Sequence, residues 1–247
     1  MLLNLFKSML VAIILALSAS FTFAQSLEIK NDKIPSFTTN KLALNLDGSR
    51  HAYHPNNEGL LSNIVGGISR EESIKNRFTE SRGYGIAKEK VKGSHLYRGY
   101  IQPNGYFVSQ TTPYYREKAE SDPERYADAE SIPYITLSPY WKAKGIRNCD
   151  IAYVQNLDNG KKSAAIFTDY RKNDEKLEIS LALAKQLGIP VHTKQYRSYD
   201  QKKLVTKYVG INNNKLKVYY FVKSGNGNGK TASEIQQLGR KLMGIKE

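Results

Sequence analysis

Two acidic residues, Asp169 and Glu178, stand nine positions apart in a stretch that could bring both to one cleft. Residues 163–168 form a short run that ends in β-branched and aromatic residues, which is typical of a buried strand, and Asp169 follows at its end. Apolar residues at three-to-four spacing predict a helix that begins near Leu177 and stops before Gly188, so we expect Glu178 in its first turn. One carboxyl that donates a proton and a second that activates water are what hydrolysis of a glycosidic bond requires.

A plainer interpretation of the same two residues stands beside this one. Surface helices often begin with Glu, because a carboxylate is favoured near the positive end of the helix dipole. Strands also often end in Asp where the chain turns. From spacing alone, the two acids would more often be surface residues without a chemical role.

The N-terminal segment predicts export. Residues 9–17 are apolar and uncharged, Lys7 precedes them, and the segment ends in small residues at Ala24. This pattern is typical of a secretory signal peptide, and it is shorter than the roughly 20 apolar residues of a membrane span. We therefore expect cleavage near Ala24, a secreted or periplasmic protein, and no stable membrane insertion after cleavage.

The amino-acid composition indicates which classes of molecule the protein could bind. Lys and Arg outnumber Asp and Glu by 37 to 23, which gives a formal net charge of +14 and favours association with anionic polymers. The basic residues are spread along the chain instead of forming the stripe interleaved with aromatic residues that is typical of nucleic-acid modules. We therefore expect no nucleic-acid partner. The four His residues lack ligand spacing, so we expect neither a metal nor a cofactor.

Hairpin signals predict the fold class. Asn104-Gly105 and residues 156–160 each separate two runs of β-forming residues, and a third hairpin is predicted around residues 212–214. Residues 231–234 match a capping box that opens a final helix reaching Met243. Because strands and helices do not alternate regularly, we expect a mainly β or α+β domain: antiparallel hairpins form a compact barrel-like sheet with two or three peripheral helices.

The domain organisation is expected to be simple. Residues 1–24 are the predicted signal peptide, residues 25–40 a flexible lead-in, and residues 41–247 a single domain. Residues 41–46 alternate apolar and polar side chains, as a half-buried strand does. Asp47-Gly48 then turns the chain towards Tyr53 and His54. These residues could contact a substrate at the strand end, although turn chemistry favours a simple Asp-Gly turn with a polar His nearby.

Four pieces of the chain, taken in order and spacing, resemble glycoside hydrolase family 75, the endo-chitosanases. Leu46-Asp47-Gly48-Ser49 with Ala52-Tyr53-His54-Pro55 resembles the family's opening motif. The others are residues 122–137, residues 159–169 and residues 178–184, which together cover about Leu42 to Pro190. Residues 191–247 lie outside the resemblance, and we interpret them as an extension to the family's domain.

The resemblance implies a function and assigns residues to it. It implies an exported enzyme that hydrolyses β-1,4 bonds in an amino-sugar polymer, chitosan or a related one, by an inverting mechanism without a cofactor or metal. Asp169 and Glu178 match the family's two essential acids, and Asp47, Tyr53 and His54 would contact the sugar. We assign Glu178 as the general acid and Asp169 as the base, with the reverse assignment left open. We expect a monomer.

The chain departs from the family between the two acids. The family follows its Asp with a turn similar to Gly-Pro and precedes its Glu with Gly, whereas here Tyr170-Arg171-Lys172 follows Asp169 and Leu177 precedes Glu178. The two cations would repel a glucosamine polymer. A non-catalytic protein that binds cell-wall polysaccharide on the same scaffold is therefore the alternative. A secreted nuclease fits the charge but lacks a His or metal constellation.

Overall fold

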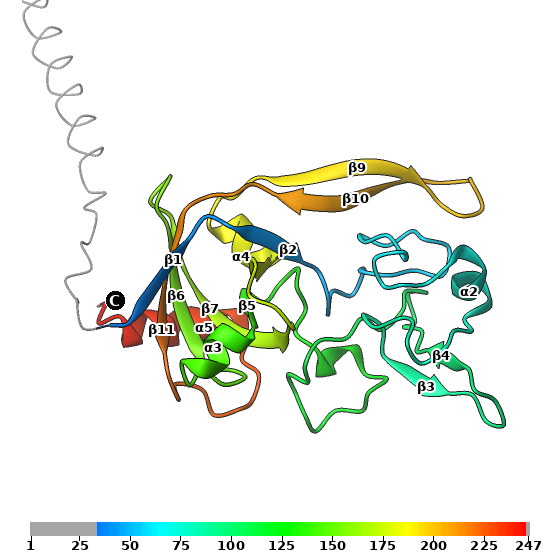
Figure 1. Ribbon diagram of the computed structural model, residues 1–247, viewed down its shortest axis with the longest axis horizontal. Coiled ribbons are helices and arrows are strands. Elements are labelled where there is room, and N and C mark those ends of the chain that lie inside the picture. Colours follow the sequence, from blue (N-terminus) through cyan, green and yellow to red (C-terminus); the bar gives the residue numbers. More distant parts are fainter. Residues whose placement is uncertain (1–33, 246–247) are drawn as a thin grey trace, which may run out of the picture. The chain divides into compact units, whose positions relative to one another are not determined.

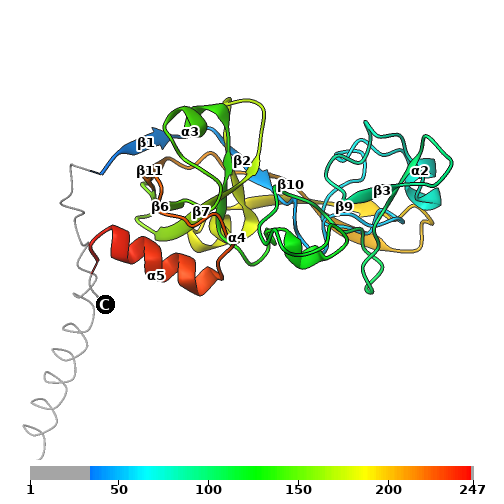
Figure 2. The same ribbon diagram turned by 90° about the horizontal axis from the view of Figure 1, so that it is seen from below.

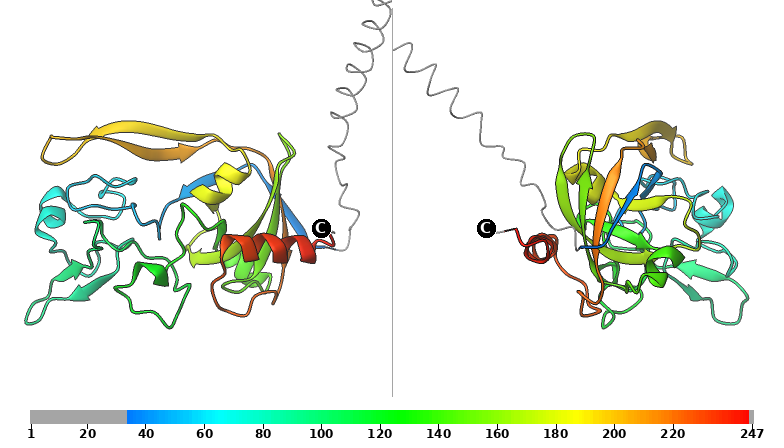
Figure 3. Two further views of the ribbon diagram at one scale, coloured as in Figure 1. Left: turned by 180° about the vertical axis from the view of Figure 1, so that it is seen from behind. Right: turned by 60° about the vertical axis from the view of Figure 1, so that its left-hand side comes forward.

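The computed structural model describes residues 34–245, and the predicted signal peptide with its cleavage site near Ala24 lies outside them. A seven-stranded sheet with the order β1-β11-β6-β7-β5-β8-β2 forms the centre of the described chain (Figure 1). Its strands are β1 (Ser36–Thr39), β2 (Leu42–Asn45), β5 (Tyr134–Leu137), β6 (Ile151–Asn156), β7 (Lys162–Tyr170), β8 (Leu177–Ser180) and β11 (Leu216–Phe221). Neighbouring strands are antiparallel except for the parallel pairs β5–β7 and β2–β8. The sheet curls into half a barrel (Figure 3), which confirms the predicted mainly β or α+β class.

Smaller elements surround this sheet. Two further sheets pair β3 (Lys88–Lys90) with β4 (Tyr97–Gly99) and β9 (Val191–Arg197) with β10 (Leu204–Ile211). Residues 34–245 contain four α-helices: α2 (Arg70–Lys75), α3 (Pro139–Ala143), α4 (Leu181–Gln186) and α5 (Ala232–Leu242), besides a 3-10 turn η1 (Pro123–Arg125). The predicted capping box at Thr231 and Glu234 is confirmed, and α5 packs along β7 and β6 (Figure 2).

Two hydrophobic cores, besides a smaller cluster of Ala87, Val108 and Tyr126, hold the described chain together. The larger core lies on the sheet, where the Trp141 ring packs against Phe167 with 5.0 Å between the ring centroids. The smaller core lies under the loops between β2 and residue 110, and its largest members are Tyr53, Phe78 and Phe107. Burial of these rings fixes loops that have little secondary structure of their own. The second core therefore holds Tyr53, which is 1% exposed, among packed side chains.

The structure confirms one predicted hairpin, contains a turn at the second and contradicts the third. β6 and β7 pair around residues 156–160, so that hairpin is confirmed. At Asn104-Gly105 the chain turns back, since the Gly105 N–H donates to the Gln102 carbonyl at 2.9 Å, and Ile101 bridges to Phe107. The predicted hairpin around residues 212–214 is wrong, because β10 pairs with β9 while β11 pairs with β6 and β1. Residues 191–197 are largely polar and exposed, so their pattern gave no apolar signal for β9.

The start of the predicted domain also needs a correction. Ser36–Thr39 of the predicted flexible lead-in forms β1, which pairs antiparallel with β11. Its apolar residue Phe37 packs against the larger core beside Tyr140 and Trp141. A single partly buried ring in a polar stretch was too weak a pattern to predict a strand.

A buried lysine attaches the β9–β10 hairpin to the loops that carry Tyr53. Lys207 on β10 is 1% exposed, and its Nζ donates to the carbonyls of Gly59 at 2.7 Å and Leu61 at 2.9 Å. Burial lowers the pKa of Lys207 to about 8. The Tyr208 N–H also donates to the Leu60 carbonyl. The hairpin after Pro190 is therefore an integral support of the loop region.

Candidate active site

Asn45, the last residue of β2, holds the two predicted acids together. Its Nδ2 donates to Asp169 Oδ2 at 3.1 Å and lies 3.4 Å from Glu178 Oε2. These two carboxyl oxygens are at most as far apart as the sum of those distances, about 6.5 Å, which places the pair at or below the range of about 6.5–9.5 Å found for inverting pairs. The two acids, predicted from a nine-residue spacing, thus face a common point.

The orientation of the Asn45 amide is fixed by partners on its other side. Its Oδ1 accepts hydrogen bonds from the Tyr134 hydroxyl at 2.9 Å and from the Asp47 N–H at 2.8 Å. Because both partners are donors, the amide NH2 group has to face the acids. Tyr134 is fully buried and also donates to the Asp47 carbonyl at 2.9 Å. Sequence reasoning missed Asn45, although a polar residue that ends an alternating strand just before Asp47 was a signal.

Asp169 occupies a β-bulge. Thr168 pairs with Thr136 and Tyr170 with Leu137, so Asp169 is the extra residue on β7. Its φ of 57° lies in the left-handed region, which is strained for a residue other than glycine and recurs at functional sites. The bulge directs the carboxyl towards Asn45 and towards the Thr112 N–H, which donates to Oδ1 at 3.2 Å. Burial raises the pKa of Asp169 to about 6, although the hydrogen bonds to it act in the opposite direction.

Glu178 lies in a strand, so the prediction that it opens a helix is wrong. Leu177 and Ile179 are buried on either side of it in β8, which is the period-two pattern of a strand. The helix begins only at Leu181, where the Ser180 hydroxyl caps it by accepting the Leu183 N–H. The spacing of Leu177 and Leu181 fits both the helical period and the strand period, so it could not distinguish a helix from a strand. Parallel pairing with β2 now places Glu178 on the same face as Asn45.

Arg171, one of the residues that departs from the family pattern, enters this site. Its Nη1 lies 3.2 Å from Glu178 Oε1, and the two side chains are 14% and 24% exposed. The same guanidinium donates to the Lys176 carbonyl at 2.6 Å, which holds it in place. The cation therefore faces a predicted catalytic acid directly instead of pointing into solvent.

Asp47 completes what we call the acid cluster, defined as Asp47, Asp169 and Glu178. The Tyr53 hydroxyl donates to Asp47 Oδ1 at 3.0 Å. Burial, followed by the negative charge of Asp169, raises the pKa of Asp47 to about 8, although the Tyr53 bond opposes this. A carboxyl with such a pKa is mainly protonated at neutral pH. The cluster therefore combines a neutral acid with two carboxyls that differ in their partners.

His54, the fifth predicted site residue, faces another set of groups. Its ring packs edge-on against Tyr106 at 4.9 Å, and its Nδ1 accepts the Asn56 N–H at 3.1 Å. The charged groups that act on it are Glu58, Lys203 and Lys207, and burial lowers its pKa. The structure thus brings Asp47, Tyr53, Asp169 and Glu178 together, and His54 belongs to the neighbouring loop packing.

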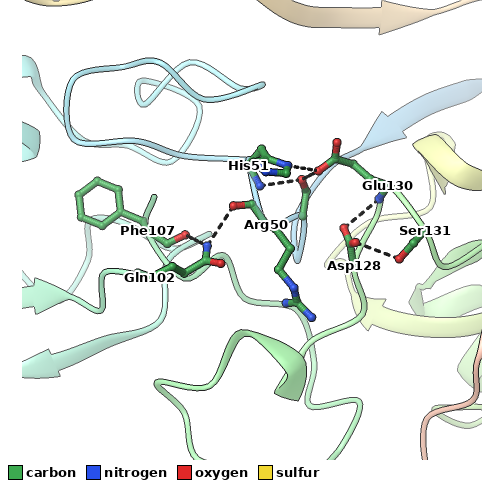
Figure 4. A network of polar contacts seen from close by, with 8 residues as sticks. Arg50, His51, Gln102, Phe107, Asp128, Glu130 and Ser131 are labelled. Atoms are coloured by element: carbon green, nitrogen blue, oxygen red, sulfur yellow. Dashed lines mark hydrogen bonds and ion pairs between the residues drawn. The ribbon is translucent and has the colours of Figure 1, made fainter. Parts of the chain in front are cut away.

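Ser49 and His51, which follow Asp47 along the chain, contact a second carboxylate, Glu130 (Figure 4). Glu130 Oε2 accepts a hydrogen bond from the Ser49 hydroxyl and lies 2.9 Å from His51 Nδ1. The Glu130 N–H in turn donates to Asp128 Oδ1 at 3.0 Å. We call Ser49, His51 and Glu130 the Glu130 network. The histidines are scattered along the sequence, and the spacing of His51 did not indicate that it would contact Glu130.

The described residues were also compared with other kinds of site and with known proteins. Within residues 34–245, no group of three or more His, Cys, Asp or Glu side chains is arranged to hold a metal ion. The helices of that same range include none with the length and apolarity needed to cross a membrane. A comparison with models of protein families and one with curated proteins found no match to this chain.

Proposed function

We propose that the chain is a glycoside hydrolase that cleaves β-1,4 bonds in an amino-sugar polymer, chitosan or a related one, with inversion at the anomeric carbon. The observation that carries this proposal is the Asn45 amide, which holds Asp169 and Glu178 within reach of one substrate bond. Both acids are half-buried and not sealed in the core, so a sugar can approach them. The resemblance of the surrounding motifs to family 75 supports the same activity.

The partners of the two acids favour one assignment of roles over the other. Burial raises the pKa of Asp169 to about 6, so near neutral pH a fraction of the molecules carries the proton that a general acid donates. Glu178 forms an ion pair with the Arg171 guanidinium, whose Nη1 lies 3.2 Å from Oε1, and a base has to be in this carboxylate form. The structure thus favours the reverse of the assignment with Glu178 as the acid.

The reaction then follows from this assignment. Asp169 gives its proton to the glycosidic oxygen while the bond from that oxygen to the anomeric carbon breaks. A water molecule attacks the anomeric carbon from the opposite face and transfers its proton to Glu178. The products are two shorter chains, one with a new reducing end of inverted configuration. Exchange of protons with solvent returns both acids to their starting state. Asn45 acts as a positioning residue for both carboxyls.

The test uses amide variants of the two acids. Wild type should release reducing ends from chitosan or its partially acetylated forms, and both Asp169→Asn and Glu178→Gln should lose that activity while keeping the melting temperature. Glu117→Gln, which changes an exposed carboxylate elsewhere, is the matched control and should be fully active. Proton NMR of the first product should show the inverted anomer. Unchanged turnover in both amide variants would overturn the proposal.

One observation favours a second function, a non-catalytic protein that binds wall polysaccharide. Arg171 already pairs with Glu178 in this structure, and a carboxylate so occupied is less available to activate water. Together with the net charge of +14, this fits a protein that holds an anionic glycan. Salt-sensitive pull-down with wall material and no product from wild type would select this function. Release of product by wild type would exclude it.

A further inference from the structure

An exposed pair of apolar side chains lies beside the acid cluster. Ile64 and Tyr84 are 74% and 64% exposed, although the loops that carry them are closely packed. The backbone of Ile64 and the ring of Tyr84 both approach Gly67: its N–H donates to the Ile64 carbonyl at 2.9 Å, and a Cβ added at Gly67 would come within 2.9 Å of the Tyr84 ring. We call Ile64 and Tyr84 the apolar lip. Exposed apolar side chains mark a binding surface where they lie close together next to a polar site.

Gly85, the residue after Tyr84, places the lip next to the acids. A Cβ at Gly85 would lie 2.8 Å from Asp47 Oδ1 and 2.7 Å from the Tyr53 hydroxyl oxygen, so the backbone here touches the Asp47–Tyr53 pair. The Gln110 side chain donates to the Tyr84 carbonyl at 3.1 Å and Ser109 donates to the Gly85 carbonyl at 3.1 Å, which fix this short segment. A sugar bound at the acids would therefore be flanked by the lip.

The charge at the acids disfavours a free amine on that sugar. The obvious partner for a glucosamine ammonium would be Glu178, but Arg171 already lies 3.2 Å from this carboxylate. An ammonium placed there would face the guanidinium at short range, where like charges repel strongly in a partly buried site. Asp47, with its pKa raised to about 8, is mainly neutral at pH 7, and both oxygens of Asp169 already accept hydrogen bonds, one from Asn45 and one from the Thr112 N–H. An uncharged substituent on the sugar avoids this cost.

We propose that the sugar held beside the acid cluster carries an N-acyl group, and that the apolar lip binds its methyl group and the apolar face of the ring. An acetamido group is neutral, so it meets no repulsion from Arg171, and its methyl group removes apolar surface of Tyr84 and Ile64 from water. This inference rests on the proposed function, because it names the substrate class of the same site. It selects N-acetylated residues of the polymer over fully deacetylated chitosan.

Binding to a catalytically silenced protein tests the inference directly. Asp169→Asn is titrated calorimetrically with the pentamer of N-acetylglucosamine and with the pentamer of glucosamine. We expect the acetylated pentamer to bind at least about tenfold tighter, a difference of about 1.4 kcal/mol. Adding Tyr84→Ala or Ile64→Ser should remove most of that preference, whereas Tyr84→Phe should keep it. Tyr196→Ala, which removes a 39% exposed tyrosine on β9, is the matched control and should change nothing.

The outcomes separate this inference from the proposed function. Equal binding of the two pentamers, or a preference for acetyl groups that survives both lip substitutions, would overturn the inference. If wild type digests fully deacetylated chitosan as fast as acetylated chitosan, and the lip variants do so too, the function stands and the inference fails. If wild type digests neither polymer while the lip still selects the acetylated pentamer, the inference stands and the hydrolase proposal fails. Melting temperatures within a few degrees of wild type are the check on folding.

Discussion

The acid cluster and the Glu130 network begin from the same short segment of chain, yet they give carboxyl groups very different surroundings. In the Glu130 network, His51 and Glu130 are 48% and 29% exposed, and one oxygen of Glu130 meets both a hydroxyl and an imidazole. In the acid cluster, three half-buried carboxyls share a small set of donors. Burial and the charges of neighbouring carboxyls raise the pKa of Asp47 and that of Asp169. The difference shows that the raised pKa values of these carboxyls follow from their surroundings, which residue type alone does not indicate.

The sharpest way to test this comparison is to remove one carboxylate from each region. Asp169→Asn should lower kcat by about 10²–10⁴-fold, because it removes proton donation to the leaving oxygen. Glu130→Gln keeps the shape of its network and should change kcat by less than about threefold, since the reaction uses no group there. Steady-state release of reducing ends measures both. A larger loss in Glu130→Gln than in Asp169→Asn would reverse the comparison.

Asn45 is the residue that distinguishes the two regions geometrically. Asn45→Ala removes the donor shared by Asp169 and Glu178, so both carboxyls lose their common orientation. We expect kcat/KM to fall by about tenfold to a hundredfold, because small displacements of catalytic groups are costly. Gln102→Ala, which removes hydrogen bonds to the Arg50 and Phe107 carbonyls next to the Glu130 network, is the matched control. An Asn45→Ala enzyme as active as wild type would show that the two acids are positioned by other contacts.

The dependence of activity on pH should report the acid cluster alone. Since Asp169 has to be protonated and its pKa is raised to about 6, kcat/KM should fall about tenfold per pH unit above pH 6. The Glu130→Gln variant should give the same profile as wild type. A profile that is flat from pH 5 to pH 8 would contradict the role of Asp169 as the acid.

We expect the smallest effect on the free energy of unfolding. The sign of its dependence on pH follows from the difference in proton binding between the folded and unfolded states. Asp47 binds its proton more tightly in the folded state, where its pKa is about 8, than in the unfolded state near 3.8. The folded state therefore holds more protons between these values, and the free energy of unfolding falls as pH rises through that window. Asp47→Asn removes this penalty, so its melting temperature relative to wild type should be higher at pH 8 than at pH 5, by about 2–4 °C per kcal/mol. Differential scanning calorimetry measures it. A gain that is the same at both pH values would contradict the raised pKa.

Much of this site could be predicted because its parts follow local patterns. The β6–β7 hairpin has an Asn-Gly turn between apolar strands, and it delivers Asp169 as expected. The pairing of Asp47 with Tyr53 agrees with their placement in one motif, although turn chemistry alone did not require it. Motif resemblance, more than spacing, brought these residues to notice.

The parts that could not be predicted depend on contacts between distant segments. Glu178 was placed in a helix because Leu177 and Leu181 satisfy the helical period, and only pairing with β2 makes that segment a strand. Asn45 gains its role from Tyr134 and from both acids, none of which is near it in sequence. Arg171 was expected to repel a substrate from outside, whereas it folds inward onto Glu178. Chain order carries little information about such encounters.

The pairing of β1 with β11 determines when the fold can form. Ser36 lies opposite Tyr219, and β11 also fills the position between β1 and β6. A polypeptide that leaves the ribosome N-terminus first cannot complete this sheet until its final strand has emerged. Contacts of such long range form slowly, so the sheet closes late in folding.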